Sequence, residues 1–244
     1  MIDETDNTNK ASLVEHLQEL RNRIVWVIGI FLVALIIGIF TTNKIFEFLK
    51  SEPPANAITL NVFSPWDAIG IWMKFSFIIA LFISLPYSLY QIWAYVRPGL
   101  LSHERKATIR YIPYATVMFI LGLLFAYYLV FPMAFYFTLN ISRRMGLQET
   151  YGIAQYFSFM INILLPVALL FELPIIVMFL TKIKLINPKI LKKIRKLAYL
   201  ILITTATILT PPDFISDIIV SVPLILLFEI SVLISNRIHL KQIS

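Results

Sequence analysis

Hydrophobic residues dominate six stretches of the chain, and short polar segments separate them. The stretches cover residues 24–40, 75–95, 111–139, 156–180, 197–210 and 214–235. A membrane-spanning helix needs about 20 apolar residues, with a range of roughly 17–25. Residues 197–210 provide only 14. A helix of that length rises about 21 Å, so we expect a thinned membrane or neighbouring helices to cover its ends.

This pattern predicts an all-α integral membrane protein with six transmembrane helices. Prolines recur within the apolar stretches, at Pro86, Pro132, Pro166, Pro174 and Pro223. Each proline removes a backbone donor and bends a helix. We therefore expect several proline-bent helices that together form a concave bundle.

Basic residues predict how this bundle is oriented. Six spans place both termini on one side, and the tails and loops of that side carry sixteen Lys and Arg residues. The opposite side carries five, namely Lys44, Lys50, Lys74, Arg143 and Arg144. Loops rich in Lys and Arg stay in the cytoplasm. The sequence thus predicts a multi-pass protein of the cell (plasma) membrane with cytoplasmic N- and C-termini.

The chain reads as a single membrane domain, residues 1–244, without an internal repeat or a soluble segment. We expect a flexible cytoplasmic tail over 1–11, a cytoplasmic amphipathic helix over 12–23, the six-span bundle over 24–235 and a second tail over 236–244. Ser12-Leu13-Val14-Glu15 fits a capping box, which predicts that the first helix begins near Ser12.

The first connection on the opposite side contains two further predicted elements. Residues 44–50 have the composition of a short interfacial helix, which Pro53-Pro54 ends. Ile58, Leu60 and Val62 then alternate with polar residues, and this period of two indicates an extended segment.

Composition narrows the function. Of the residues, 59% are hydrophobic and 14% are charged, against about 25% charged in a soluble domain. The absence of cysteine excludes disulfides and thiolate chemistry. We find no H-E-x-x-H, no G-x-S-x-G and no glycine-rich phosphate loop. We therefore expect no enzyme activity, no cofactor, no metal site and no nucleic-acid partner.

Two glutamates, Glu19 and Glu104, are predicted to face the cytoplasm. Glu19 precedes the first span, and Glu104 lies between the second and third spans, next to His103. A carboxylate binds a guanidinium well, because the arginine fork matches two oxygens. The alternatives are a helical pair of Glu19 with Arg23, worth about 0.2–0.5 kcal/mol, and a solvated loop charge at Glu104.

Glu172 is the sharpest anomaly of the sequence. It lies about ten residues from Lys182 inside an apolar stretch, so it is roughly 15 Å deep in the membrane. A carboxylate at that depth costs several kcal/mol and is by default a functional residue. The alternative is a carboxyl group hydrogen-bonded to a neighbouring helix.

Polar residues also occur in the last two spans. Thr204, Thr205 and Thr207 make the short fifth span unusually polar, and they suit either packing within the bundle or docking of a partner helix. Glu229 lies nearer the cytoplasmic surface, where snorkelling is the alternative to function. At the other end, a tight turn at Pro211, Pro212 and Asp213 precedes the sixth span.

Six short motifs give this chain a resemblance to the TatC family, the polytopic subunit of the twin-arginine protein translocase. They occur in one order over nearly the whole chain: His16-Leu17-x-Glu19-Leu20-Arg21-x-Arg23, Tyr90-Gln91-x-Trp93-Ala94-Tyr95-Val96-x-Pro98-Gly99-Leu100, His103-Glu104-Arg105, Phe171-Glu172-Leu173-Pro174, Thr210-Pro211-Pro212-Asp213 and Leu227-Phe228-Glu229-Ile230. Any one motif is short, whereas all six on six predicted spans are specific.

The resemblance implies a receptor for signal peptides that bear paired arginines. It implies TatA-type and TatB-type single-span partners, the lipid bilayer as surroundings, a homo-oligomer in the receptor complex, and export of folded cargo driven by the proton-motive force. By motif position, the residues implied in signal-peptide binding are Glu19, Arg21, Tyr95, Leu100 and Glu104. Tyr95 stands where many members carry Phe. Glu172 matches the intramembrane carboxylate of the family, and the last two spans match its partner-docking region.

Two other classes stay open on the residues alone. A secondary transporter also places a glutamate near broken helices, but it usually shows an internal repeat and several polar midplane residues. An intramembrane enzyme needs a nucleophile beside a base, and this chain offers no such pair.

Overall fold

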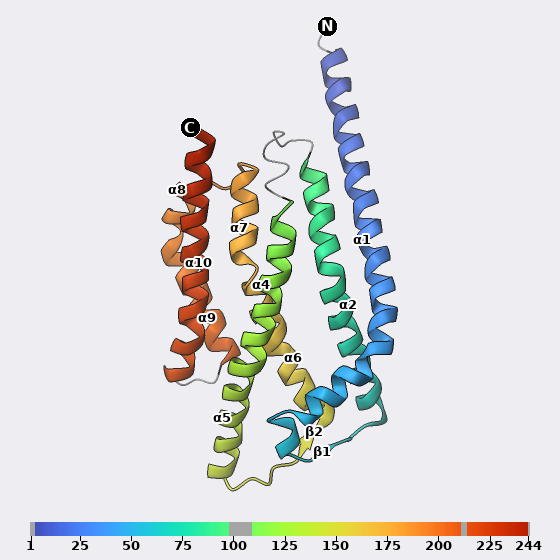
Figure 1. The fold of residues 1–244 in the computed structure, drawn as a ribbon, viewed down its shortest axis with the longest axis vertical. Helices are drawn as coiled ribbons and strands as arrows, with labels where there is room; N and C mark the ends of the chain where they lie inside the picture. The colour runs from blue at the N-terminus through green and yellow to red at the C-terminus, as the bar shows by residue number, and fades with distance from the viewer. Residues whose placement is uncertain (1–2, 98–108, 211–213, 244) are drawn as a thin grey trace.

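Long helices make up nearly all of the fold (Figure 1). The structure is a computed structural model that describes the backbone of residues 3–97, 109–210 and 214–243 and the side chains of 17–97, 109–210 and 216–240. The elements are α1 (Asp3–Ser51), η1 (Ala55–Ala57), β1 (Leu60–Asn61), α2 (Pro65–Val96), α4 (Tyr111–Phe125), the π-helical turn η3 (Ala126–Val130), α5 (Phe131–Arg144), β2 (Tyr151–Gly152), α6 (Ile153–Leu170), α7 (Leu173–Lys182), α8 (Pro188–Lys193), α9 (Arg195–Leu209) and α10 (Phe214–Ile243).

Among the residues that the structure describes, five helical segments are long and apolar enough to cross a membrane. They cover Leu17–Ser51, Pro65–Val96, Tyr111–Arg144, Ile153–Lys182 and Ser216–Leu240. The fold is therefore that of an all-α polytopic membrane protein. The expected fifth span is α9, whose 15 residues rise only about 22 Å. Whether α9 completes the sixth crossing stays a prediction.

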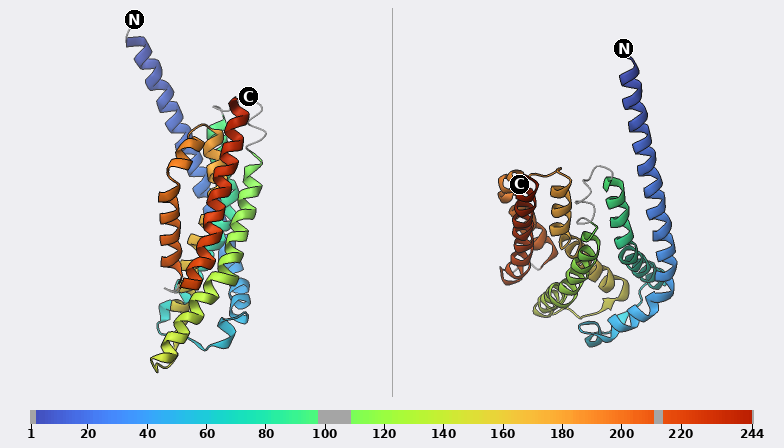
Figure 2. Two further views of the ribbon diagram at one scale, coloured as in Figure 1. Left: turned by 90° about the vertical axis from the view of Figure 1, so that its left-hand side faces the viewer. Right: turned by 45° about the horizontal axis from the view of Figure 1, so that its top comes forward.

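The helices stand side by side in a curved row, as two views agree (Figures 1 and 2). The row runs from α1 through α2, α4 and α7 to α10, and α9 packs against α10. α1 and α10 lie at opposite ends of the row, but the start of α1 and the end of α10 both lie at the same end of the bundle, the top in Figure 1. The C-terminal end of α2 and the start of α4 also lie there.

The first helix is longer than predicted at both ends. α1 begins at Asp3 rather than near Ser12, so the helix includes residues 3–11 of the segment that we expected to be a flexible tail. It also continues through residues 44–50, which we expected to form a separate interfacial helix. Thr41 and Thr42 explain this continuity, because their hydroxyls donate to the carbonyls of Ile37 and Gly38 at 2.8 Å. The polar residues are thus satisfied inside the helix and do not end it.

Prolines produce one clear break and one helical irregularity. The helix that starts at Ile153 ends at Leu170, and α7 begins at Leu173 with Pro174 in its first turn. Pro132 stands in the first turn of α5, directly after the π-helical turn η3. A proline has no backbone N–H and cannot donate a hydrogen bond to the preceding turn. The regular pattern of helical backbone hydrogen bonds is therefore interrupted at both sites.

A two-stranded sheet closes the end of the bundle opposite the termini. β1 pairs in parallel with β2, and Leu60 lies opposite Tyr151. The extended segment predicted around residues 58–62 is confirmed over Leu60–Asn61. Its partner strand has two residues, too few to produce a period in the sequence.

Two glycines permit close helix packing. A Cβ built on Gly38 of α1 would stand 2.5 Å from the carbonyl oxygen of Ser76 in α2. A Cβ on Gly122 of α4 would stand 2.8 Å from the Cα of Ala168 in α6 and from the Cβ of Phe171. Small residues of this kind let membrane helices approach one another closely. Each glycine thereby fixes the helix pair that carries one part of the candidate site.

Candidate functional site

A polar hollow of about 510 Å³ lies between α1 and α2, toward the end of the bundle that holds both termini. Its lining residues are Gln18, Glu19, Asn22, Arg23, Trp26 and Gln91. Five of the six belong to α1, where spacings of three and four residues place side chains on one helical face.

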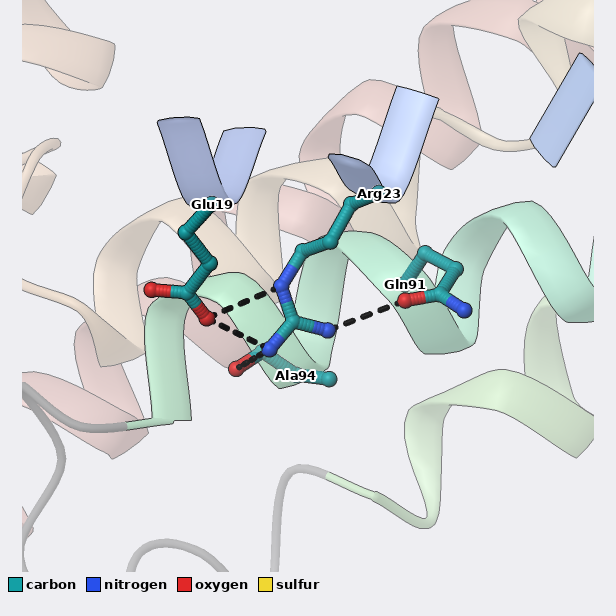
Figure 3. Close-up of polar contacts among 4 residues, drawn as sticks. All are labelled: Glu19, Arg23, Gln91 and Ala94. Carbon is teal, nitrogen blue, oxygen red and sulfur yellow. Dashed lines mark hydrogen bonds and ion pairs between the residues drawn. The ribbon is translucent and has the colours of Figure 1, made fainter. Parts of the chain in front are cut away.

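Arg23 is the centre of the polar contacts in this hollow (Figure 3). Its Nε and Nη2 donate to the same oxygen, Oε1 of Glu19, at 3.0 and 2.6 Å. Its Nη1 donates to Oε1 of Gln91 at 2.9 Å, and its Nη2 also donates to the carbonyl of Ala94 at 3.2 Å. Arg23 therefore fastens α1 to the last turns of α2.

The pairing that we held as the alternative for Glu19 is thus present. Glu19 and Arg23 form an ion pair four residues apart, and their side chains are 37% and 24% exposed. The other carboxylate oxygen of Glu19 points away from Arg23 (Figure 3). The site consequently shows a carboxylate that binds a guanidinium at a solvent-accessible hollow.

The other residues predicted for peptide binding lie in different places. Arg21 is exposed and does not line the hollow, because residues two apart do not share a helical face. Tyr95 is half-buried in α2, one residue beyond Ala94. Leu100 and Glu104 lie outside the described residues.

A second cavity, of about 220 Å³, lies on the other side of α2. Trp93 of α2, Tyr111 of α4 and Phe179 of α7 are among the residues that line it, and so is Glu172. Gln91 and Trp93 are two residues apart, so α2 presents one to the polar hollow and the other to this cavity.

Glu172 is buried, with 6% of its surface exposed, at the break between α6 and α7. Its backbone is satisfied, since its carbonyl accepts from the amides of Ile175 and Ile176 at 3.0 Å. Its side-chain Oε1 is buried and has no hydrogen-bond partner among the described residues. The expected alternative, a bond from a neighbouring helix, is not found for this oxygen.

The predicted docking residues of the last two helices fall into two groups. Thr204 and Thr207 of α9 are exposed, and Thr205 and Thr207 donate to carbonyls of their own helix, those of Ile201 and Ile203. Glu229 of α10 is instead engaged within the chain. It accepts from Arg195 at 2.8 Å and from the hydroxyl of Tyr199, so it links α10 to α9. Pro211, Pro212 and Asp213 lie outside the described residues.

Gln91 is the site residue that sequence reasoning missed. Gln91 belongs to one of the motifs, but its role appears only in the structure. Its Oε1 accepts a hydrogen bond from Arg23, which is 68 residues away in the sequence, and its Nε2 donates to the hydroxyl of Tyr87 at 2.6 Å. A glutamine on a helix carries no periodic signal that would reveal such a partner.

Comparison with known proteins identifies one family. The family model described as "Sec-independent protein translocase protein (TatC)" matches residues 15–223. The chain is 42% identical to the Sec-independent protein translocase protein TatCy of Bacillus subtilis, over 96% of this chain and 92% of that protein. It is 40% identical to TatC of Halalkalibacterium halodurans, over 96% and 93%.

Solved structures agree with this similarity. The structure described as "Crystal Structure of Twin Arginine Translocase Receptor- TatC in DDM" superposes with a TM-score of 0.76 at 32% identity. The match covers 89% of this chain and 98% of that one. A second TatC crystal structure gives a TM-score of 0.73 at 31% identity.

Proposed function

Because the chain belongs to the TatC family of Sec-independent protein translocase proteins, we propose that it is the receptor subunit for twin-arginine signal peptides. Glu19, together with Glu104, binds the arginine pair at the cytoplasmic end of the bundle. With TatA-type and TatB-type partners, the protein mediates export of folded cargo driven by the proton-motive force. The protein lies in a bacterial plasma membrane, and both of its termini are on the cytoplasmic side.

One observation carries the proposal: Glu19 binds a guanidinium through a single oxygen at the open hollow. Hydrogen bonds between charged groups are short and about twice as strong as neutral ones. The surroundings of Glu19 therefore suit an arginine, and a peptide arginine would meet the same carboxylate that Arg23 meets. Arg23 itself stays in place through Gln91 and Ala94.

Glu172 supplies the second part of the proposal. Its Oε1 has no hydrogen-bond partner among the described residues, and Glu172 lines the cavity between α2, α4 and α7. An unsatisfied buried oxygen costs about 1–3 kcal/mol, so a polar group that reaches it gains in affinity. We assign it to a polar group of the peptide or of a partner helix, with the apolar part of the signal peptide held by the concave face of the bundle.

Partner docking rests on α9. This helix exposes Leu200, Ile201 and Ile208 together with Thr204 and Thr207, and its bound hydroxyls leave a surface suited to another membrane helix. Glu229 contributes by holding α9 against α10 through Arg195 and Tyr199.

The test is binding of a twin-arginine signal peptide to the purified full chain in detergent, alongside its Lys-Lys counterpart. Glu19→Gln keeps the size of the side chain and removes its charge. We expect it to weaken binding of the twin-arginine peptide by at least about tenfold, since a charge-assisted bond is worth about 1.5–3 kcal/mol.

The matched control is Glu149→Gln. Glu149 also pairs with an arginine, Arg143 at 2.7 Å, but at the opposite end of the bundle. Its loss should leave peptide affinity unchanged. Two results would show that the carboxylate of Glu19 does not recognise the peptide arginines. One is equal binding of both peptides to the unmodified chain, and the other is an equal loss of peptide affinity in the Glu19→Gln and Glu149→Gln variants.

A further inference from the structure

A third hollow, unrelated to the proposed peptide site, combines polar and apolar walls. This groove of about 350 Å³ lies between α1, α2 and α6. Leu35, Phe77, Ile161 and Leu165 are among its apolar residues, and its polar residues are Lys74, Ser158 and Asn162. It opens on the membrane-facing surface, because Lys74 and Asn162 are both exposed.

Lys74 and Asn162 lie at a similar distance from the starts of their helices, and Ser158 lies one helical turn closer to the start of α6. Lys74 is nine residues from the start of α2, and Asn162 is nine residues from the start of α6. α2 has 32 residues and rises about 48 Å, whereas the hydrocarbon core measures about 30 Å. A centred α2 extends about 9 Å beyond the core, which places Lys74 roughly 5 Å inside it.

Lys74 carries a charge that no acidic side chain among the described residues neutralises. Its Nζ donates to Oγ of Ser158 at 2.6 Å, and it forms no ion pair with any side chain that the structure describes. None of the residues that line the groove is acidic. A cation at this depth is costly unless an anion or water reaches it.

We infer that this groove binds an anionic phospholipid of the leaflet opposite the chain termini, with its phosphate at Lys74 and Ser158 and an acyl chain along the apolar wall. Lys74 complements the negative charge of the phosphate. The hydroxyl of Ser158 and the side-chain amide of Asn162 supply further hydrogen-bond donors. Under the orientation proposed above, this is the outer leaflet. The inference does not depend on signal-peptide binding.

The size of the groove favours a lipid over a partner helix. A helix with its side chains is about 10–12 Å across. A volume of about 350 Å³ is near the lower limit of small-molecule sites, which run from about 300 to 1,000 Å³. The groove has room for a phosphate and the adjoining part of an acyl chain, whereas a helix would only cover its opening.

Native mass spectrometry of the purified full chain tests the inference. The chain is titrated with phosphatidylglycerol, with phosphatidylcholine and with inorganic phosphate. We expect tight retention of one phosphatidylglycerol. Lys74→Met should lower that retention about fivefold, as the loss of one lysine at an anionic surface does, and Ser158→Ala should lower it about twofold.

Lys44→Met is the matched control, because Lys44 is an exposed lysine of α1 that does not line the groove. It should retain the lipid fully. Equal retention in the Lys74→Met variant would overturn the site, and equal retention of phosphatidylcholine would overturn its preference for an anion. If inorganic phosphate bound as well as the lipid, the groove would be a phosphate site and the proposal of a lipid ligand would be wrong.

A photoreactive residue at Met73, which lines the groove and is 49% exposed, tests the occupant in cells. An adduct with the mass of a phospholipid supports the inference. An adduct with a protein in its place would identify a partner helix and overturn it.

Discussion

Glu19 and Glu172 lie on either side of the last turns of α2, and their surroundings are opposite in kind. Glu19 is exposed enough to meet water and is bound by Arg23. Glu172 is buried, and one of its oxygens has no partner among the described residues. The first is a paired carboxylate that a competing guanidinium can approach, whereas the second has one buried oxygen without a partner among the described residues.

The two carboxylates therefore affect the stability of the fold in opposite directions. A paired surface glutamate contributes little to folding, with a median near 0–1 kcal/mol. A buried oxygen without a partner destabilises the fold by about 1–3 kcal/mol. Retention of such a residue at the break between α6 and α7 is expected where function requires it.

The largest expected effect concerns the packing behind Glu172. Gly122→Ala places a Cβ 2.8 Å from the Cα of Ala168 and from the Cβ of Phe171, the residue before Glu172. Overpacking of this kind costs about 1–3 kcal/mol. The measurement is unfolding of the purified chain in detergent, monitored by circular dichroism.

Gly29→Ala is the control for this substitution. Nothing lies within 4 Å of a Cβ at Gly29, which is also helical. Alanine should therefore leave stability unchanged or raise it by up to about 1 kcal/mol. Equal destabilisation by both substitutions would show that the contact with α6 is not the cause.

The second prediction concerns Glu172 itself. Glu172→Leu replaces an unsatisfied carboxylate by an apolar side chain of similar size, so we expect the free energy of unfolding to rise by about 1–2 kcal/mol. Export of a twin-arginine substrate in cells should fall at the same time. A destabilised variant would show that the carboxylate has a partner and that the contrast with Glu19 is wrong.

The smallest effect is expected on the side of Glu19. Arg23→Met removes the guanidinium that joins Glu19 to Gln91 and Ala94, and we expect a loss of about 1 kcal/mol because the pair is partly exposed. Arg21→Met should cost less than about 0.5 kcal/mol, since Arg21 is exposed and lies outside the hollow. Chemical unfolding of the two variants in parallel gives this difference. An equal loss in both would mean that the link between α1 and α2 contributes nothing to stability.

Much of this arrangement could be predicted from the residues. The apolar stretches predicted the long helices, and Pro174 predicted the break beside Glu172. The spacing of Glu19 and Arg23 predicted their pair. The length of α1 could not be predicted in the same way, because Thr41 and Thr42 look like a polar stop until their hydroxyls are seen to bind the helix itself.

The class of protein and the long apolar helices follow from the sequence alone, since both depend only on local composition and on helix length at 1.5 Å of rise per residue. The tertiary structure decided which side chains share a hollow. Gln91 reaches Arg23 across 68 residues, and Lys74 reaches Ser158 across 84. Helix packing sets such pairs, through contacts like that of Gly38 with Ser76. A single helix has no period that encodes the rotation of its neighbour, so only the packed bundle could show them.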